Sequence, residues 1–201
     1  MIYLDPSQEY ILEDDRVLLR PLRADDMELL LPFSLHEPEI WAFSLVTAAG
    51  EENLKKYIDT AQRNRADGRE YPFIVFDKKT QRYAGSTRFY DIQPAFDTLQ
   101  LGYTWYGKDF QGTGLNKHCK SLLLQFAFEK VGVVRVEFRA DNNNKRSIAA
   151  MKSIGCVEEG VLRHHLPKID GTGRRDSIIL SILKEEWPAV KNSLLQSISI
   201  F

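Results

Sequence analysis

The feature that most constrains the fold of this chain is a loop with two closely spaced glycines between an aromatic segment and a helical pattern. Residues 103–116 run Tyr-Thr-Trp-Tyr-Gly-Lys-Asp-Phe-Gln-Gly-Thr-Gly-Leu-Asn. Glycine has no Cβ and adopts positive φ readily, so Gly112 and Gly114 allow consecutive backbone N–H groups to turn toward one anion. A helix that begins near Leu115 would add the positive end of its dipole. The loop therefore predicts a phosphate cradle between a strand and a helix.

Two common phosphate-binding loops do not match this segment. Gly107 and Gly112 have the spacing of the glycines in a Walker A loop, but residues 113–114 are Thr-Gly, where Lys-Ser or Lys-Thr should reach the terminal phosphates and magnesium. The segment from Gly112 also begins like a dinucleotide fingerprint, yet Lys117 occupies the third-glycine position, where the helix must approach a strand closely. These departures weigh against an NTPase and a Rossmann protein. A tight turn without a ligand is the remaining alternative.

The loop and a second segment downstream resemble the GNAT acetyltransferases. That family's acetyl-CoA signature is usually written Arg/Gln-x-x-Gly-x-Gly/Ala. Here residues 109–114 are Asp-Phe-Gln-Gly-Thr-Gly, with Asp109 at the first position and Gln111 beside the first glycine. Residues 135–156 resemble the strand, Asn-x-x-Ser turn and helix of the branch that includes the ribosomal-protein N-terminal (Rim-type) acetyltransferases. Further matches follow in that branch's order at 158–163, 170–171, 174–176 and 185–188. The resemblance covers about Val17 to Pro188.

The resemblance implies one GNAT-like domain over residues 1–201, of the α/β (α+β) class, with a mixed, mostly antiparallel sheet flanked by helices. It implies acetyl-CoA as cosubstrate and no metal. The residues that it assigns to acetyl-CoA binding are Tyr103, Thr104, Trp105, Gln111, Gly112, Thr113, Gly114, Leu115, Asn116 and Asn144. The segment 103–105 would hold the pantetheine arm through backbone hydrogen bonds and direct one N–H to the thioester oxygen. Ordinary sheet packing is the alternative for this aromatic segment.

The pattern of apolar residues and turns agrees with such a fold. It predicts strands at 17–21, 72–76, 83–90, 99–106 and 133–139, a final hairpin of 156–166 with 174–183, and helices from residue 24 and at 51–66, 115–130, 145–154 and 187–196. Residues 197–201 receive no assignment. Cys119 shares the apolar helical spacing of its segment, and Cys156 follows the helix-ending Gly155, so both are interpreted as core residues rather than nucleophiles.

Composition narrows the classes of partner. With 201 residues, 43% hydrophobic and 27% charged, the chain is long enough for one domain with a sizeable core. A net charge of −1 gives no basic field to gather nucleic acid. We find no signal-peptide pattern and no apolar run of membrane-spanning length, and two cysteines without metal-ligand spacing suit a reducing compartment. We therefore expect a cytoplasmic protein with no nucleic-acid or membrane partner. A homodimer is left open.

Acetyl transfer from a thioester to an amine needs a neutral amine, a polarised carbonyl and a proton for the departing thiolate. Many GNAT enzymes use a Tyr as the proton donor, in the helix after the Asn turn, but here that position is Met151. The branch resemblance offers Ser147 instead, with its hydroxyl near the sulfur and Asn144 on the pantetheine. The ordinary alternative is that Asn144 caps a helix and Ser147 occupies its first turn.

A general base is harder to assign. Some relatives carry a Glu on the strand after the Glu-Gly step, whereas residues 163–167 are Arg-His-His-Leu-Pro. His165 matches a histidine common in the branch, and imidazole titrates near neutrality, so it could accept a proton directly or through water. A structural role is the usual one for a lone histidine in a strand. Adjacent His164 and His165 should point to opposite faces of a strand, so at most one of them faces the site.

The missing carboxylate favours an acceptor of modest pKa. An α-amine with a pKa of about 7.7–8.0 needs roughly 1 kcal/mol to become neutral at pH 7, whereas a lysine near 10.4 needs roughly 4–5 kcal/mol. We therefore expect an acetyl-CoA-dependent N-acetyltransferase that acts directly on a primary amine, most simply a protein or peptide N-terminus, with Ser147 and His165 as catalytic candidates. A small-molecule amine fits equally well. A CoA-binding sensor without catalysis, favoured by Met151 and the missing Glu, is the alternative from another class.

Overall fold

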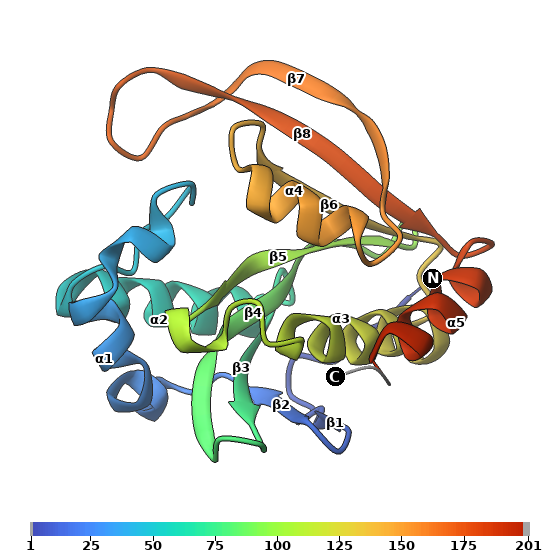
Figure 1. Ribbon diagram of the computed structural model, residues 1–201, viewed down its shortest axis with the longest axis horizontal. Helices are drawn as coiled ribbons and strands as arrows, with labels where there is room; N and C mark the ends of the chain where they lie inside the picture. The colour runs from blue at the N-terminus through green and yellow to red at the C-terminus, as the bar shows by residue number, and fades with distance from the viewer. Residues whose placement is uncertain (1, 199–201) are drawn as a thin grey trace.

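A computed structural model of the chain, which describes residues 2–198, has one mixed sheet with helices on both sides (Figure 1). The strands are β1 (Leu12–Glu13), β2 (Val17–Pro21), β3 (Tyr71–Asp77), β4 (Arg82–Gln93), β5 (Thr98–Tyr106), β6 (Arg135–Asp141), β7 (Val157–Pro167) and β8 (Arg174–Leu183). The α-helices are α1 (Met27–His36), α2 (Glu51–Ala66), α3 (Leu115–Gln125), α4 (Lys145–Lys152) and α5 (Trp187–Ile198). Short 3-10 turns are η1 (Ala24–Asp26), η2 (Pro38–Trp41) and η3 (Lys108–Phe110), and a π-helical turn, η4 (Phe126–Val131), extends α3.

The strands pair in the order β1-β2-β3-β4-β5-β6-β8-β7, and every neighbouring pair is antiparallel except β5 with β6. This confirms the predicted mixed, mostly antiparallel sheet. Strand β3 is buried along nearly its whole length, which is the pattern of a strand covered on both faces. Helices α1 and α2 lie on one side of the central strands, and α3 with α5 on the other (Figure 1).

The pairing of β5 with β6 is short. It joins Thr98 to Arg135, Leu99 to Val136 and Gln100 to Glu137, whereas β5 continues to Tyr106 and β6 to Asp141. Beyond the Gln100–Glu137 pair the two strands diverge. We call the diverging segments, residues 101–106 of β5 and 138–141 of β6, the fork. The narrow end of the fork is at Gln100, and its wide end leads from Tyr106 into the glycine loop.

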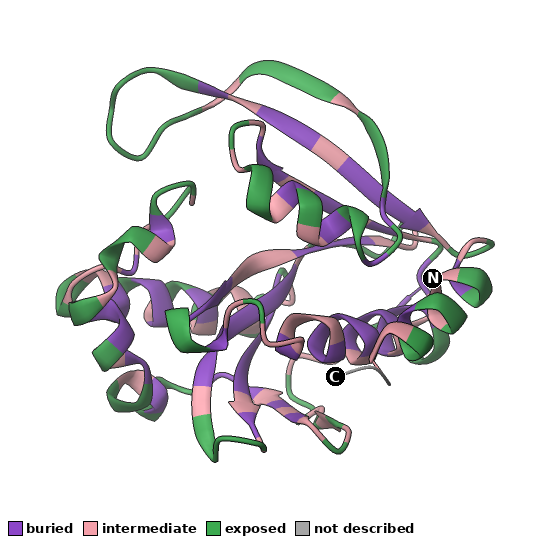
Figure 2. Cartoon of the chain, viewed as in Figure 1, coloured by how far each residue is buried: buried purple, intermediate pink, exposed green. Residues whose placement is uncertain are grey.

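Helical periodicity explains how the helices bury one face. On α2, Leu54, Tyr57, Ile58 and Ala61 recur at helical spacing and are buried. Helix α3 differs, because it lies between the sheet and α5 and buries polar residues as well as apolar ones. Figure 2 shows the buried residues concentrated in the central strands and α3, and the exposed ones on the outer helical turns and on β7.

The predicted elements all occur, with differences at their ends. The helix expected at 115–130 is α-helical only to Gln125 and then widens into η4, which Gly132 ends with a φ of 86°. Its neighbour β6 begins at Arg135 rather than at residue 133. The short β1 and the η2 turn were not predicted, because neither is long enough to show a period. Among residues 2–198, none of the helices is long and apolar enough to span a membrane. Residues 199–201 lie outside the described residues.

Candidate active site

The fork opens into a cavity of about 690 Å³. Its lining comes from the loop around η2, α2, the end of β4, both strands of the fork, the glycine loop, α3, α4, β7 and β8. Such a volume is typical of a pocket that encloses most of a small ligand. The cavity therefore joins the predicted phosphate cradle to residues from distant parts of the chain.

The glycine loop has the backbone geometry that an anion cradle needs. Gly112 and Gly114 have φ values of 75° and 86°, as the sequence predicted. Gly114 is the N-cap of α3 in the left-handed conformation, so the helix begins at Leu115. No hydrogen bond among residues 2–198 uses the backbone N–H groups of Gly112 to Asn116. Five successive donors are thus available at the positive end of a helix dipole, which is the arrangement that binds phosphate.

Side chains complete the cradle and add charge. Gln111 donates from Nε2 to the Tyr106 carbonyl at 2.8 Å and accepts from Arg146 through Oε1. Arg146, near the start of α4, and Lys117, on α3, both line the cavity at this end. Both are positive, so they would offset the charge of a pyrophosphate. The sequence motifs did not identify Arg146, because its approach to the loop depends on how α4 lies across the fork.

The Asn-x-x-Ser segment begins α4 as a capped helix. Asn144 is the N-cap, and its Oδ1 accepts a hydrogen bond from the Ser147 backbone N–H at 3.1 Å. This is the capping arrangement that we considered as the ordinary alternative. Both residues also line the cavity, and the cap leaves the Ser147 hydroxyl unused. Capping and a role in the site are therefore compatible.

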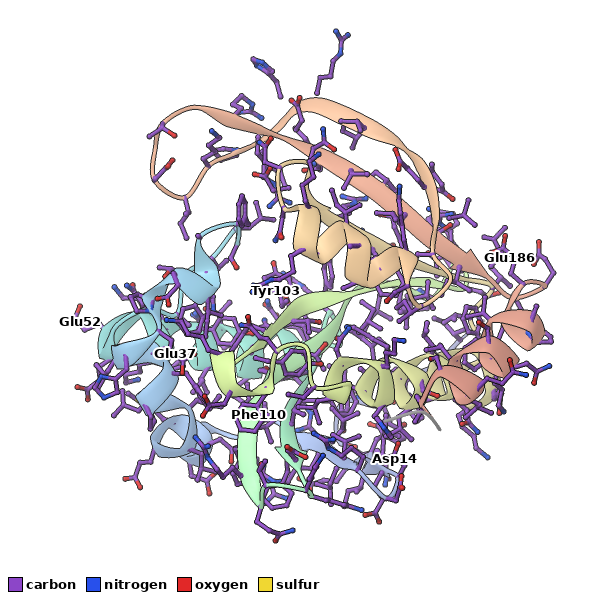
Figure 3. All side chains as sticks on the ribbon, in the orientation of Figure 1. Asp14, Glu37, Glu52, Tyr103, Phe110 and Glu186 are labelled. Carbon is purple, nitrogen blue, oxygen red and sulfur yellow. The ribbon has the colours of Figure 1, made fainter. Side chains whose placement is uncertain are left out.

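A β-bulge shapes the β5 side of the fork. Ser86 pairs with Trp105 and Arg88 with Gly102, so β5 carries one more residue than β4 between these pairs. The bulge includes Tyr103, whose φ of 48° is uncommon for a residue with a side chain. Bulges of this kind interrupt strand pairing and are frequent beside active sites. Tyr103 is labelled near the middle of the molecule in Figure 3.

A buried arginine contacts the side chain of Tyr103 in the bulge. The Arg88 guanidinium lies 4.4 Å from the ring centroids of both Tyr57 and Tyr103, and its Nη1 is 2.5 Å from Glu70 Oε2. Two cation–π contacts and one ion pair hold the side chain in place. Burial raises the pKa of the Tyr103 hydroxyl, so this residue stays neutral in the cavity wall. The position of Tyr103 is thus fixed by Tyr57 of α2, Arg88 of β4 and, through Arg88, Glu70 just before β3.

Lys120 is an unexpected cavity residue. It points from α3 toward the fork, is 5% exposed, and donates from Nζ to Thr104 Oγ1 at 2.8 Å and to Thr87 Oγ1 at 3.4 Å. Its Nζ also lies 5.9 Å from the centroid of the Phe138 ring. Burial lowers the pKa of Lys120 to about 8. A lysine within an amphipathic pattern is usually solvated, so no sequence pattern identified Lys120 as a site residue.

Exposed apolar side chains of the loop after η2 and two arginines also line the cavity. The exposed side chains are those of Phe43, Leu45 and Val46. Arg175 of β8 is buried and donates from Nη1 to the Phe43 carbonyl at 3.1 Å, which ties the loop to the last hairpin. Arg139, on β6, donates from Nε to Glu137 Oε1 at 2.6 Å.

The two carboxylates that line the cavity are both engaged. Asp91 accepts from Gln100 Nε2 at 2.6 Å and from Gln93 Nε2 at 2.7 Å. Asp141 accepts from the Asn143 backbone N–H at 2.8 Å. Both carboxylates are therefore held in hydrogen bonds within the protein. Residues 163–167 of β7 also supply no carboxylate as a general base.

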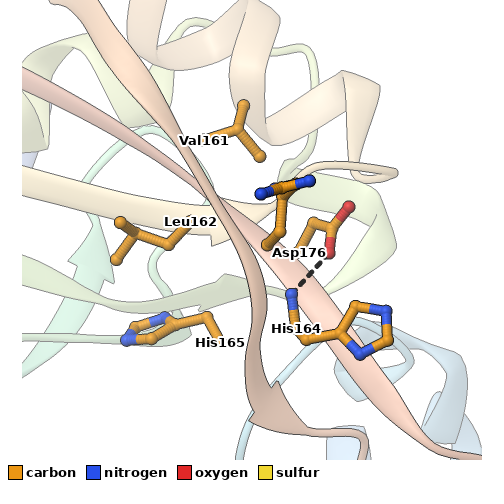
Figure 4. A pocket seen from close by; sticks show the side chains of 6 residues that line it. Val161, Leu162, His164, His165 and Asp176 are labelled. Atoms are coloured by element: carbon orange, nitrogen blue, oxygen red, sulfur yellow. Dashed lines mark hydrogen bonds between the residues drawn. The ribbon is translucent and has the colours of Figure 1, made fainter.

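The two histidines lie on opposite sides of β7 (Figure 4). His164 has a φ of 49°, and its backbone N–H donates to Asp176 Oδ1 at 2.7 Å within an irregular stretch of the β7–β8 pairing. His165 contributes to a separate open pocket on β7 rather than to the large cavity, which its neighbour Leu166 lines. Its Nδ1 is buried without a hydrogen-bond partner among the described residues. Burial, and then the charges of Arg139, Arg175 and Arg174, lower the pKa of His165.

Most of the predicted site residues meet in the cavity. Its lining includes Tyr103, Thr104, Trp105, Gln111, Gly112, Gly114, Asn116, Asn144 and Ser147. Three predicted residues do not line it with their side chains: Leu115 is in the core, Thr113 donates from Oγ1 to the Phe110 carbonyl at 2.8 Å, and His165 lies outside as described above.

Neither cysteine is available as a nucleophile. Cys119 and Cys156 are both buried and form no disulfide. Burial raises the pKa of each thiol to about 12. Because the thiolate is the reactive form, these residues are inert at neutral pH. This confirms their interpretation as core residues.

A cluster of potential ligand atoms lies apart from the cavity lining. Asp14, Asp15 and His118 bring such atoms within 4.8 Å of one another. His118 Nδ1 is 2.7 Å from Asp14 Oδ2, a contact that joins the segment before β2 to α3. This link accounts for the position of the buried imidazole without an ion.

Comparison with known proteins agrees with this geometry. A family model described as the Acetyltransferase (GNAT) domain matches residues 16–157. YdaF of Bacillus subtilis (strain 168), whose name assigns it provisionally to the ribosomal N-acetyltransferases, is 35% identical over 107 residues, which are 53% of this chain and 57% of that relative.

Solved structures share the fold over nearly the whole chain. A GCN5-related N-acetyltransferase from Brucella melitensis has a TM-score of 0.87 and 25% identity, covering 96% of this chain and 87% of the other. RimJ of Mycobacterium smegmatis, solved in complex with CoA-disulfide, has a TM-score of 0.75 and 21% identity, covering 96% and 95%.

The diverging strands β5 and β6 lie beside a glycine loop at the start of α3. Together with the matching family model and the shared fold, this arrangement identifies an acyltransferase of the N-acetyltransferase class. The chain belongs to the GNAT acetyltransferase family.

Proposed function

We propose that this chain transfers an acetyl group from acetyl-CoA directly to a primary amine, and that the α-amine of a peptide or protein N-terminus is its acceptor. The observation that carries the proposal is the continuous cavity from the cradle into the fork. The GNAT family uses acetyl-CoA, and the RimJ relative of the same fold was solved with a CoA compound. The name of YdaF refers to ribosomal N-acetyltransferases, which supports a protein as the acceptor.

Each part of the cavity has a role in this proposal. The free N–H groups of Gly112–Asn116, with Lys117 and Arg146, hold the pyrophosphate. The pantetheine arm extends along the backbone of 103–105 and past Asn144. The thioester supplies an activated acyl group, and the chain supplies position, exclusion of water and proton transfer.

Ser147 is the hydrogen-bond donor to the sulfur in this proposal, and His165 is the base. His165 would act through water, since it lies outside the cavity lining. An acyl-enzyme is not part of the reaction, because both thiols are buried with raised pKa values.

The acceptor class follows from the lack of a free carboxylate in the cavity lining. An α-amine with a pKa of about 7.7–8.0 is about half neutral near pH 8, whereas a lysine side chain near 10.4 needs a stronger base to lose its proton. The apolar residues Phe43, Leu45 and Val46 of the loop after η2 line the cavity, where a peptide chain could continue beyond its N-terminus. The use of acetyl-CoA and the free thiols suit a cytoplasmic location.

Thiol release from acetyl-CoA tests the proposal against a panel of amines. The panel pairs each peptide that has a free α-amine with the same sequence carrying a formyl block, and every peptide contains one lysine. We expect thiol release with the free peptides and none with the blocked ones. Equal rates for both members of a pair would assign the activity to the lysine side chain. Binding of acetyl-CoA without turnover on peptides or small amines would favour a sensor.

A further inference from the structure

Lys120 is a buried cation in the fork without an anionic partner. None of the carboxylates among residues 2–198 forms an ion pair with it, and its hydrogen bonds go only to Thr87 and Thr104. The desolvation of a buried ammonium is unfavourable, and hydrogen bonds to neutral hydroxyls offset less of this cost than an ion pair would. A ligand that brings negative charge to this point would therefore be stabilised by it.

The ammonium of Lys120 contacts both strands of the fork. Thr104 belongs to β5 within the fork, and Phe138 is the first β6 residue beyond the last pair with β5. The titratable groups that act on Lys120 are Cys119 on its own helix and Cys156 just before β7. Both thiols have pKa values raised to about 12, so they are neutral at pH 7 and supply no counter-charge.

The direction of the cosubstrate brings its sulfur toward this ammonium. The pyrophosphate belongs at the wide end of the fork, where Gly112–Asn116 present free N–H groups. An arm that extends from there toward the narrow end runs beside Thr104 and Phe138 before it reaches Gln100. The thioester is at the tip of that arm.

We propose that Lys120 is a further catalytic residue, whose Nζ contacts the CoA sulfur, stabilises it as a thiolate and donates its proton. This inference rests on the proposed use of acetyl-CoA. The acceptor nitrogen forms a bond to the acetyl carbon, the carbon–sulfur bond breaks, and its electron pair leaves with sulfur. One N–H proton of Lys120 then moves to sulfur, giving CoA thiol and a neutral amine. The proton lost by the acceptor nitrogen passes through water to His165, which releases it to solvent, and Lys120 takes up a proton from solvent again.

The chemistry of this pair is well matched. Burial lowers the pKa of Lys120 to about 8, and an ordinary thiol has a pKa of about 8.5. A proton transfer between groups of similar pKa near the working pH is efficient. Ser147, on α4, can donate a hydrogen bond to sulfur but carries no charge. Lys120 therefore adds the positive charge that Ser147 lacks.

Binding of CoA and S-methyl-CoA tests the contact without any acceptor. Calorimetry across pH 6.5–9.5 compares the two ligands in wild type and in Lys120→Met. The methyl thioether cannot ionise. The affinity for S-methyl-CoA therefore measures whether the variant is folded and whether all contacts other than the one to the sulfur are intact. Wild type should bind CoA about 10-fold or more tightly than S-methyl-CoA, which is the size of a hydrogen bond to a charged group. This preference should be greatest near pH 8, where one proton is shared by the amine and the thiol.

Lys120→Met should lose the preference for CoA and its pH dependence while keeping its affinity for S-methyl-CoA. Lys117→Met is the matched control, a second α3 lysine of the cavity lining, and should weaken both ligands alike. An unchanged preference in Lys120→Met, or an equal loss of both ligands, would overturn the inference. Acetylation of Lys120 itself, seen by mass spectrometry after incubation with acetyl-CoA, would also overturn it. If the wild type does not bind CoA, both this inference and the proposed function are wrong. If it binds CoA but transfers acetyl to no amine, the proposed function is wrong and the contact between Lys120 and sulfur is still decided by the comparison of the two ligands.

Discussion

Replacing Lys120 by methionine should stabilise the folded chain at neutral pH. Methionine is an unbranched apolar side chain one atom shorter than lysine, so it fills most of the same space and removes the charge together with the contact between Nζ and the Phe138 ring. The two hydroxyls that it leaves behind remain paired, because Thr87 Oγ1 and Thr104 Oγ1 are 2.7 Å apart. The substitution therefore creates little new unsatisfied polarity in the core.

The shifted pKa of Lys120 sets the size of the expected difference in unfolding free energy. It falls from the ordinary value of 10.5 to about 8, chiefly because burial disfavours the charged form. Each pKa unit corresponds to about 1.4 kcal/mol, so the ammonium costs the folded state about 3 kcal/mol below pH 8. Between pH 8 and 10.5 the unfolded chain holds the proton and the folded chain does not. The stability of the wild type should therefore rise with pH across this window, and the advantage of the variant should shrink.

Urea unfolding of wild type and Lys120→Met at pH 6.5, 8 and 9.5 measures this difference. Subtracting the two proteins removes the contribution of every other titrating group. Lys130→Met, at an exposed lysine of η4, is the control and should change the unfolding free energy by less than about 0.5 kcal/mol. A difference that does not vary with pH, or a variant less stable than wild type at pH 6.5, would refute the reasoning.

Three further substitutions test the site. Gly114→Val should weaken acetyl-CoA binding by at least about tenfold, because Gly114 has a φ of 86° and a side chain there would obstruct the pyrophosphate; calorimetry with circular dichroism as the folding check decides it, and unchanged affinity in a folded variant would remove the cradle. Ser147→Ala should lower kcat more than acetyl-CoA affinity, since its contact matters most as charge develops on sulfur; equal losses would leave only a binding role, and no loss would make it a bystander. His165→Gln should flatten the acidic limb of the kcat/KM profile, which we expect below pH 6.5 because burial and three arginines lower the pKa of His165. Two acceptor amines of different pKa are needed there, and a limb that follows the amine in both proteins would exclude His165 as the base.

Much of the fold could be predicted from local pattern. The bounds of β2 and α2 match the predicted ranges 17–21 and 51–66, because strand alternation and helical periodicity act over neighbouring residues. The fork could not be derived in this way. It depends on which strands pair and where the β5–β6 pairing stops, and both are set by contacts between distant segments. The extra β5 residue at Tyr103 likewise appears only when β4 lies beside it.

The candidate site likewise contains residues that local sequence predicts and residues that only tertiary contacts bring to it. The glycine cradle was predictable, because positive φ and a helix start are local properties of the sequence around Gly112 and Gly114. Arg146 and Lys120 were not, since each owes its place in the cavity to the packing of a helix across the fork. The burial of Lys120 and the approach of the exposed Arg146 to the glycine loop are set by tertiary contacts, which leave no period or motif in the sequence.

A crystal structure of the chain with CoA tests the central claim most directly. We predict that the pyrophosphate accepts hydrogen bonds from the backbone N–H groups of Gly112–Asn116 and that the pantetheine arm lies between residues 101–106 of β5 and 138–141 of β6. The sulfur should then lie near Ser147 and Lys120. CoA bound elsewhere, or strands β5 and β6 closed against each other with the ligand outside, would contradict the account.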